Sequence, residues 1–334
     1  MSTDELRAKI ARLPRLALAH LPTPLEEAPR FSKALGGPRI LIKRDDCTGL
    51  LFGGNKTRHN EFLMADALEK KADVVVWGAG VQSNNCRQTA AACAKLGLEC
   101  RLVLTKAVHD ADVQGNLLLD YLMGAKVQIV DVPMGPALDD LLLGEAEKLR
   151  REGRRPYVWD RITGRPRAAV SYALCLAEIV EQLKGRPARA VYAAAAGATG
   201  AGLVLGKKAL AWPGAVKLSS PIVWPWDIPQ DMAEVANATA ELLGLPQRLT
   251  AAEVDIRTDF IGERYGAVTK EGKEALALLA HTEGILLDPV YTAKAMAALI
   301  HDVRDGRWTK DDTIVFLHTG GTPAVFAYRD ELMA

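Results

Sequence analysis

Two short stretches carry residues whose types and spacing could do covalent chemistry on a carbonyl or an amine. The first reads Gly-Gly-Asn-Lys-Thr-Arg over residues 53–58. A lysine held in a turn of small residues could form a Schiff base with an aldehyde cofactor. Its amine must lose a proton to react, and burial beside other cations lowers the pKa of a lysine. Lys56 is therefore the candidate nucleophile.

The second stretch reads Gln-Ser-Asn-Asn-Cys-Arg-Gln-Thr over residues 82–89, between a strand-like run and a helix-like run. Ser83 and Asn84 would place a hydroxyl, an amide and backbone N–H groups at the start of a helix, where an anion can bind. Alone, the first stretch is typical of a turn and the second of a helix cap. Their occurrence together favours a functional site.

A third stretch, residues 194–203, reads Ala-Ala-Ala-Gly-Ala-Thr-Gly-Ala-Gly-Leu. It follows a strand-like run and opens a helix-like run, and such a turn can hold a phosphate with its backbone N–H groups. The glycine spacing does not fit a dinucleotide fingerprint, and no acidic ribose partner follows at the expected distance. A nucleotide-binding oxidoreductase is therefore disfavoured.

Composition limits the class of protein. The chain has 334 residues, of which 49% are hydrophobic and 25% charged, with a net charge of +1. These values are typical of a globular enzyme, and the length favours two domains. The low net charge argues against a nucleic-acid or acidic-membrane partner. We expect a cytoplasmic protein without a signal peptide or membrane span, and without a metal site, because the Cys and His spacings do not suit one.

Short runs rich in Val, Ile and Leu alternate with Ala/Leu/Glu/Lys segments of helical period, which predicts an α/β fold with a parallel sheet. The expected strands are residues 73–77, 100–104, 126–130, 157–159, 190–192, 215–218 and 313–317. The expected helices include residues 61–70, 87–95, 137–151 and 271–281.

Several motifs together resemble the D-cysteine desulfhydrase and 1-aminocyclopropane-1-carboxylate deaminase family, which includes cysteate sulfo-lyase-like members. The motifs are residues 41–49, 53–58, 82–90, 284–296 and 316–321. The resemblance runs from about residue 12 to residue 328, in family order. It implies a pyridoxal 5'-phosphate enzyme of fold type II, the tryptophan-synthase-β type.

The resemblance also implies two parallel-sheet, three-layer domains in each subunit of a homodimer. Residues 1–57 and 163–334 would form a large cofactor-binding domain, and residues 58–162 a small one. The cofactor would lie in the cleft between them, which is compatible with ligand binding at the carboxyl ends of parallel strands.

Site residues follow from the resemblance. It implies catalytic roles for Lys56, Ser83 and Tyr291. It implies cofactor binding by Asn55, Lys56, Asn84, Gly197, Ala198, Thr199, Gly200, Thr292 and Thr319. It implies binding of a small amino-acid substrate by Gln82, Ser83, Asn84, Asn85, Arg165 and Tyr291.

The reaction type depends on Thr292 and Thr319, which by resemblance line the pyridine ring and its nitrogen. The deaminase branch has a glutamate and a leucine at these positions. A hydroxyl leaves the ring nitrogen less charged than a carboxylate does, which favours β-elimination over ring opening. We expect a carbon–sulfur lyase that gives pyruvate, ammonia and a sulfur product. The alternatives are an L-cysteate sulfo-lyase, a 1-aminocyclopropane-1-carboxylate deaminase and a catalytically quiet cofactor-binding homologue.

Three departures from the family pattern concern the substrate. Asn85 stands where the family often has a histidine. Arg161, Arg165 and Arg167 occupy a segment where the family has a small polar turn, and they suit either a second anionic group, such as a sulfonate, or a solvated loop. The segment 219–227 contains two tryptophans, at positions 224 and 226, which could line the substrate pocket or shield a domain joint.

Overall fold

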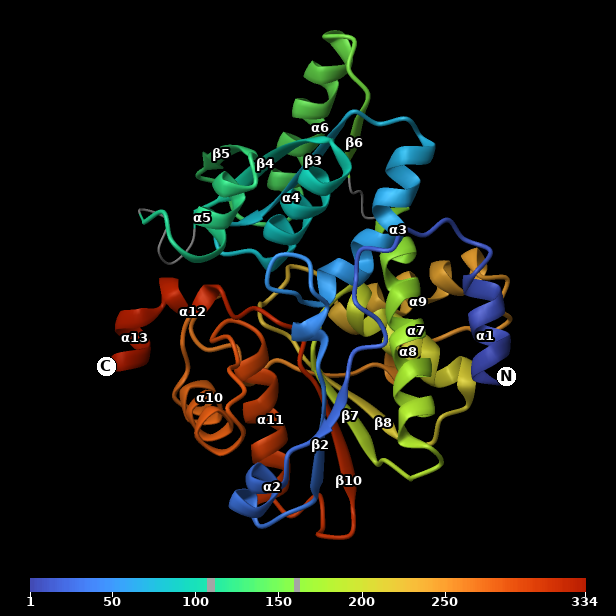
Figure 1. Cartoon of the computed structure of the whole chain (residues 1–334), viewed down its shortest axis with the longest axis vertical. Coiled ribbons are helices and arrows are strands. Elements are labelled where there is room, and N and C mark those ends of the chain that lie inside the picture. Colours follow the sequence, from blue (N-terminus) through green and yellow to red (C-terminus); the bar gives the residue numbers. More distant parts are fainter. Residues whose placement is uncertain (107–111, 159–162) are drawn as a thin grey trace.

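The computed structural model describes residues 1–106, 112–158 and 163–334, and the chain is built on two separate β-sheets (Figure 1). The larger sheet has six strands in the order β1-β2-β10-β7-β8-β9. All neighbours in it are parallel except β1, which is antiparallel to β2. Its strands are β1 (Leu25–Glu27), β2 (Arg39–Lys43), β7 (Ala190–Ala194), β8 (Ala215–Ser219), β9 (Asp255–Arg257) and β10 (Thr313–Leu317).

The smaller sheet has four parallel strands in the order β5-β4-β3-β6. All four lie between residues 74 and 158, inside the segment expected to form the small domain. The strands are β3 (Val74–Gly80), β4 (Glu99–Thr105), β5 (Lys126–Val130) and β6 (Pro156–Val158).

Helices cover both faces of each sheet, which gives the three-layer α/β arrangement expected from the sequence (Figure 1). In the large sheet, α7 and α8 pack on one face and α2, α10 and α11 on the other. The helices are α1 (Thr3–Ile10), α2 (Pro29–Leu35), α3 (Asn55–Glu69), α4 (Asn84–Leu96), α5 (Gly115–Leu122), α6 (Pro136–Arg151), α7 (Gly164–Leu183), α8 (Ala198–Leu210), α9 (Ile228–Leu242), α10 (Lys270–Glu283), α11 (Thr292–Arg304), α12 (Ala324–Ala327) and α13 (Arg329–Met333). Two short 3-10 helices are η1 (Asp45–Cys47) and η2 (Ala251–Glu253).

The buried valines of β3 explain why a fully apolar run forms a strand here. Val74 and Val76 face one side and pack with Leu138 and Leu142 of α6. Val75 faces the other side and joins the core cluster that contains α4. Successive strand residues point to opposite faces, so a sheet covered by helices on both sides requires apolar residues at every position.

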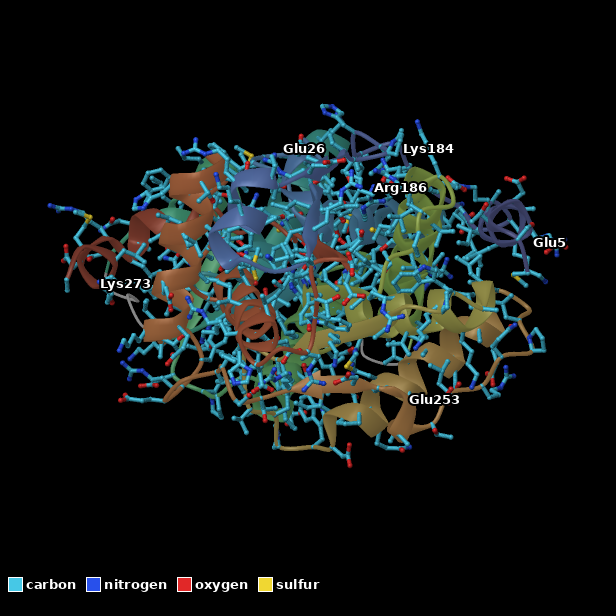
Figure 2. All side chains as sticks on the ribbon, turned by 90° about the horizontal axis from the view of Figure 1, so that it is seen from below. Glu5, Glu26, Lys184, Arg186, Glu253 and Lys273 are labelled. Atoms are coloured by element: carbon cyan, nitrogen blue, oxygen red, sulfur yellow. The ribbon has the colours of Figure 1, made fainter. Side chains whose placement is uncertain are left out.

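Charged side chains such as Glu5, Lys184, Arg186 and Glu253 project from the outside of the molecule (Figure 2). The charge pattern is therefore that of a solvated surface around two covered sheets. Within the described ranges, no helix combines the length and the apolar composition needed to cross a bilayer.

Candidate active site

A cavity of about 280 Å³ opens at the carboxyl ends of strands from both sheets. Gly78 and Ala79 of β3 line it from the small sheet, and Ala194 at the end of β7 and Thr319 after β10 line it from the large sheet. Open α/β sheets bind ligands at this edge because the connections to the following helices diverge there. The cavity is also where the three sequence motifs meet.

Lys56 lines the cavity from the first turn of α3, not from the turn before a helix as the sequence suggested. Gly54 caps this helix with a φ of 124°, a conformation that favours glycine. A Cβ added at Gly320 would come within 2.6 Å of the Gly54 Cα, so the backbones of two distant segments touch here. Burial and the nearby Arg165 guanidinium lower the pKa of Lys56 to about 8.

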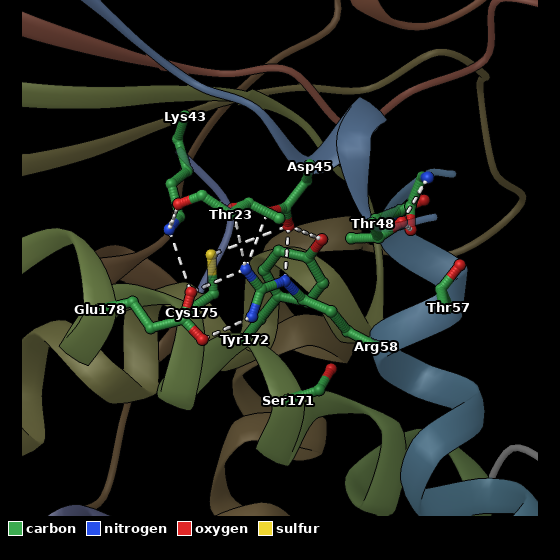
Figure 3. A network of polar contacts seen from close by, with 12 residues as sticks. Thr23, Lys43, Asp45, Thr48, Thr57, Arg58, Ser171, Tyr172, Cys175 and Glu178 are labelled. Carbon is green, nitrogen blue, oxygen red and sulfur yellow. Dashed lines mark hydrogen bonds and ion pairs between the residues drawn. The ribbon is translucent and has the colours of Figure 1, made fainter. Parts of the chain in front are cut away.

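A buried ion-pair cluster anchors α3 one half-turn after Lys56 (Figure 3). The Arg58 Nε donates to Asp45 Oδ2 at 2.8 Å, and its Nη1 donates to Glu178 Oε1 of α7 at 2.9 Å. Lys43 Nζ also donates to Glu178, at 3.0 Å, and the Tyr172 hydroxyl donates to Asp45 at 2.6 Å. Three other elements, β2, η1 and α7, are therefore tied to the helix that carries the candidate nucleophile.

The N-termini of α4 and α8 also face the cavity. Ser83 caps α4, and its Oγ accepts from the backbone N–H of Asn85 at 3.2 Å and of Cys86 at 3.3 Å. Gly197 precedes α8, and Gly197, Ala198 and Thr199 all line the cavity. The first N–H groups of a helix have no partner within it and attract anions. Alanine side chains at this turn leave these backbone donors in place.

Thr199 links the N-termini of α8 and α3. Its Oγ1 accepts from Asn55 Nδ2 at 3.0 Å and lies 3.0 Å from His59 Nε2. Burial, with the neighbouring charges of Lys56 and Arg58, lowers the pKa of His59 well below its ordinary value. The imidazole of His59 is therefore neutral, and it adds no positive charge beside Thr199.

Asn84 is oriented by a polar cluster in the small-sheet layer. Asn116 Nδ2 donates to Asn84 Oδ1 at 2.9 Å, and the Gln82 side-chain oxygen accepts from the backbone N–H of Asn116 at 2.9 Å. Arg87 Nε donates to Asn116 Oδ1 at 2.8 Å. Because its oxygen is occupied, Asn84 offers its NH₂ group to a ligand as a donor. The Oδ1 of the next residue, Asn85, is buried with no hydrogen-bond partner among the described residues.

Tyr291 and Tyr265 line the cavity together, with their hydroxyl oxygens 2.5 Å apart. Burial raises the pKa of both phenols. Asp288 fixes Tyr291 because its carboxylate accepts from the backbone N–H of Tyr291 at 2.9 Å. Sequence reasoning missed Tyr265, since an isolated tyrosine in a glycine-containing loop carries no local signal.

The structure brings most of the expected site residues to one cavity. Those that line it are Asn55, Lys56, Ser83, Asn84, Asn85, Arg165, Gly197, Ala198, Thr199, Tyr291 and Thr319. Gln82, Gly200 and Thr292 do not line it. Gln82 instead holds Asn116 and Gly200 packs closely against Met232, while the Thr292 hydroxyl donates to Asp288 at 2.7 Å. Direct contact of these three residues with a ligand stays a prediction, which the lining of the cavity does not support.

The arginines do not form one cationic group at the cavity. Arg165 lines it, but its guanidinium makes two bonds to Asp231, at 2.8 and 2.5 Å. Arg167 pairs with Asp66 at 3.3 Å and does not line the cavity. Arg161 lies outside the described residues. Both described arginines belong to the first turn of α7, where acidic residues of other helices neutralise them.

The residues present fit a phosphorylated aldehyde cofactor. Lys56 supplies an amine whose lowered pKa favours the reactive free base. Ala198 and Thr199 supply backbone donors at the start of α8, and Asn84 supplies a side-chain donor between them and the small sheet. An amine, an anion-binding helix start and an amide donor thus share one cavity.

Comparisons with known proteins agree with this chemistry. The family described as "Pyridoxal-phosphate dependent enzyme" matches residues 16–320. A D-cysteine desulfhydrase of Klebsiella pneumoniae (strain 342) is 39% identical over 335 residues, covering 97% of this chain and 98% of that protein. A D-cysteine desulfhydrase of Serratia proteamaculans (strain 568) is 38% identical over 337 residues, covering 98% and 99%.

A solved structure of an ACC deaminase homologue has a TM-score of 0.88 and 33% identity, covering 98% of both chains. The matched family spans both sheets and all the cavity-lining motifs. The three-layer domains are those of pyridoxal-phosphate fold type II. By its sequence, its fold and the residues around Lys56, this chain belongs to the family of pyridoxal-phosphate-dependent enzymes.

Proposed function

We propose that this enzyme is a β-eliminating carbon–sulfur lyase that acts on cysteine or a cysteine-like amino acid and gives pyruvate, ammonia and a sulfur product. The observation that carries the proposal is that Lys56, Ser83 and Tyr291 open onto one cavity. The similarity to two D-cysteine desulfhydrases over nearly the whole chain supports the same reaction class.

Lys56 is proposed to hold the cofactor and, once displaced by the substrate amine, to move the proton of the substrate Cα. A lysine with a pKa of about 8 is present in both protonation states near neutral pH, which suits a group that accepts and returns a proton. When bound, pyridoxal phosphate withdraws electrons from the substrate Cα. Burial, and after it the charge of the Arg165 guanidinium, disfavours the charged form of Lys56 and so lowers its pKa.

Binding roles divide between two helix starts. We assign the cofactor phosphate to Gly197, Ala198 and Thr199 at the start of α8, with Asn55 holding the threonine hydroxyl. We assign the substrate carboxylate to the Ser83 hydroxyl and the N-terminus of α4, where the N–H groups of Asn85 and Cys86 already donate to the Ser83 Oγ. Each anion then lies at a helix N-terminus, where the helix dipole is positive and stabilises negative charge.

Proton delivery to the leaving sulfur is assigned to Tyr291. Its phenol remains protonated at neutral pH because burial raises its pKa. Tyr265 lies within hydrogen-bonding distance of it and can replace a donated proton. Sulfur that is protonated as it departs leaves as a neutral thiol, which is a better leaving group than a thiolate. This pair would therefore speed cleavage of the Cβ–S bond.

The alternatives receive less support from the cavity. Thr292, at the position where the deaminase branch has a glutamate, carries a hydroxyl that donates to Asp288. Thr319 lines the cavity with a hydroxyl where that branch has a leucine. Neither threonine offers the carboxylate that would favour ring opening of the cyclopropane amino acid. A sulfonate would need a free cation, whereas Arg165 is already bound to Asp231 by two bonds. We therefore place cysteine-like substrates ahead of 1-aminocyclopropane-1-carboxylate and cysteate.

We also propose the division into a large domain (1–57 and 163–334) and a small domain (58–162), a homodimer and a cytoplasmic location. An exposed apolar group on the adjacent helices α5 and α12, made of Leu118, Tyr121, Leu122 and Phe326, supports the homodimer. The five cysteines are free thiols, which supports a reducing compartment. Sedimentation of the wild type and of Leu122→Lys tests the dimer.

A substrate panel tests the reaction. The cofactor-loaded enzyme is incubated with D-cysteine, L-cysteine, cysteate and 1-aminocyclopropane-1-carboxylate, and pyruvate, 2-oxobutyrate, sulfide and sulfite are measured. We expect pyruvate and sulfide in equal amounts from one enantiomer of cysteine. Production of 2-oxobutyrate alone, or of sulfite in preference to sulfide, would overturn the proposal.

A further inference from the structure

One part of the cavity wall is apolar and aromatic, and none of its residues is assigned to the cofactor. It contains three of the six tryptophans of the chain and three aliphatic or thioether side chains. We call this part the aromatic wall, and its residues are Trp77, Met134, Leu138, Ile222, Trp224 and Trp226. The residues assigned to the cofactor come from other segments and are mostly polar.

The aromatic wall is formed jointly by residues of both sheets. Trp77 belongs to β3, Met134 lies in the turn before α6, and Leu138 lies in the first turn of α6, all in the small-sheet layer. Trp224 and Trp226 follow β8 of the large sheet, and a Cβ added at Gly135 would lie 3.8 Å from the Trp226 ring. The two layers therefore approach each other at Trp226, where a ligand between them would lose contact with water.

The two tryptophans after β8 present flat faces. Their ring centroids are 4.5 Å apart and their planes differ by 15°, so they are stacked. Trp224, Trp226 and Trp77 are all half-buried, which leaves part of each ring for a ligand. Flat indole surfaces favour a planar apolar partner by stacking and by burial of apolar area.

The charges near the aromatic wall do not suit an anionic arm. Among the described lining residues, the cations are Lys56 and Arg165. Lys56 is assigned to the cofactor, and Arg165 is bound to Asp231 by two bonds. Within the described part of the lining, an anionic substituent on the substrate would be desolvated against indole rings without a free cation, which is unfavourable.

We propose that the enzyme takes a cysteine whose sulfur carries an apolar, planar group, such as an S-aryl or S-arylmethyl cysteine, with that group against the aromatic wall. This inference rests on the proposed β-elimination and specifies its substrate class. The Cα–H and Cβ–S bonds break, the sulfur leaves as the thiol, and one water converts the three-carbon remainder to pyruvate and ammonium. The thiol takes the proton that the phenol of Tyr291 supplies.

Steady-state kinetics of the cofactor-loaded enzyme test the inference with both enantiomers of cysteine, S-benzylcysteine and cysteate. We expect KM for S-benzylcysteine to be roughly tenfold below that for cysteine, from burial of the added ring. Trp224→Ala and Trp226→Ala should raise KM for S-benzylcysteine by about threefold to tenfold and leave KM for cysteine within about twofold. Trp308→Phe, which alters a tryptophan bonded to Tyr192 away from the cavity, is the matched control.

A binding measurement separates this inference from the proposed reaction. Calorimetry with homophenylalanine, which has the planar arm but no leaving group, should show tighter binding than norvaline, and Trp226→Ala should abolish the difference.

If cysteine is cleaved but neither KM nor binding responds to the ring or to the tryptophans, the substrate class is wrong and the elimination stands. If no amino acid is cleaved while homophenylalanine still binds through Trp226, the elimination is wrong and the pocket assignment stands. Preference for cysteate would overturn the inference. If either alanine variant fails to fold, Trp224→Phe and Trp226→Phe, which keep a smaller ring, should raise KM for S-benzylcysteine by a smaller factor.

Discussion

The hydroxyl oxygens of Tyr265 and Tyr291 lie 2.5 Å apart, with their rings in an edge arrangement at 6.1 Å between centroids. At this separation one phenol donates its proton to the other, so only the accepting phenol has its own proton free for a ligand. Asp288 holds the backbone of Tyr291 in place, whereas Tyr265 belongs to a loop between β9 and α10. The two tyrosines therefore form a hydrogen-bonded pair in which Tyr291 is held more firmly in place than Tyr265.

Removing the two hydroxyls should have unequal effects. We expect Tyr291→Phe to lower kcat by roughly a hundredfold to ten-thousandfold, the usual loss for a general acid. Tyr265→Phe should cost less, because it removes only the group that replaces the proton. The double variant should be no slower than Tyr291→Phe, since the two act as a unit. The measurement is pyruvate release, with Tyr192→Phe as a control for a buried tyrosine outside the cavity. A larger loss in Tyr265→Phe than in Tyr291→Phe would exchange the assigned roles.

Geometry, and not pKa, should select the lysine that carries the cofactor. Burial lowers the pKa of both Lys56 and Lys294 to about 8, so both amines are reactive by this criterion. Only Lys56 lines the cavity, and Lys294 Nζ donates to the Ile261 carbonyl at 2.5 Å. Borohydride reduction followed by peptide mapping should label Lys56 alone. Label on Lys294 would contradict the site.

The rate of cofactor attachment should depend on pH through Lys56. The reactive form is the free amine, which makes up about a tenth of an amine of pKa 8 at pH 7 and about nine tenths at pH 9. Attachment to the apoenzyme, followed by absorbance, should therefore accelerate as the pH rises through about 8.

Arg165→Gln should move this pH dependence upward, because the Arg165 charge contributes to lowering the pKa of Lys56. At pH 7 the variant should attach the cofactor more slowly than the wild type. Arg165→Lys retains the positive charge and is the matched control. A downward move in Arg165→Gln would mean that the charge near Lys56 acts in the opposite sense.

Loss of the amide behind Asn84 should weaken cofactor binding without removing any cavity-lining residue. Asn116→Ala deletes the donor to Asn84 Oδ1, a bond worth about 0.5–1.5 kcal/mol net. The dissociation constant of the cofactor should rise roughly twofold to tenfold, measured by titration of the apoenzyme. Asn237→Ala removes a comparable amide bonded to the Leu249 backbone and should leave this constant unchanged. An equal change in both variants would indicate a general loss of stability.

The ion-pair cluster behind Lys56 should dominate the effect of charge removal on stability. Arg58→Met leaves the buried carboxylates of Asp45 and Glu178 without their main partner and should cost about 3–5 kcal/mol. Arg7→Met breaks a half-exposed pair with Glu181 and should cost no more than about 1 kcal/mol. Urea unfolding measures both. If the two variants lose similar amounts of unfolding free energy, the buried cluster contributes no more to stability than a surface ion pair does.

Much of the fold could be predicted because strand composition and helical period are local signals. All seven expected strand runs coincide with strands in the described residues, although Trp159 at the end of one lies outside them. The expected helix starting at Glu61 begins earlier, at Asn55, because Gly54 adopts a φ that caps it. β2 was not expected as a strand, and the very short β1 and β9 carry too few residues for a pattern.

The site was predicted less completely because pairing between distant residues leaves no local signal. Lys56 and Ser83, which motif and resemblance singled out, both line the cavity. It could not show that Asp231, far along the chain, would bind Arg165, or that Asp288 would take the Thr292 hydroxyl. Partners of this kind depend on the packing of helices and become visible only in three dimensions.

The place of β10 has a consequence for how the enzyme is made. This strand, residues 313–317, lies between β2 and β7 and is the last strand along the described residues. The following Gly320 touches the backbone of Gly54 beside Lys56. During synthesis, β2 therefore has no β10 to pair with until the roughly 270 residues between the two strands have been translated. The small sheet can form earlier from contiguous sequence, whereas a nascent chain stalled before β10 would have no completed pocket for the cofactor.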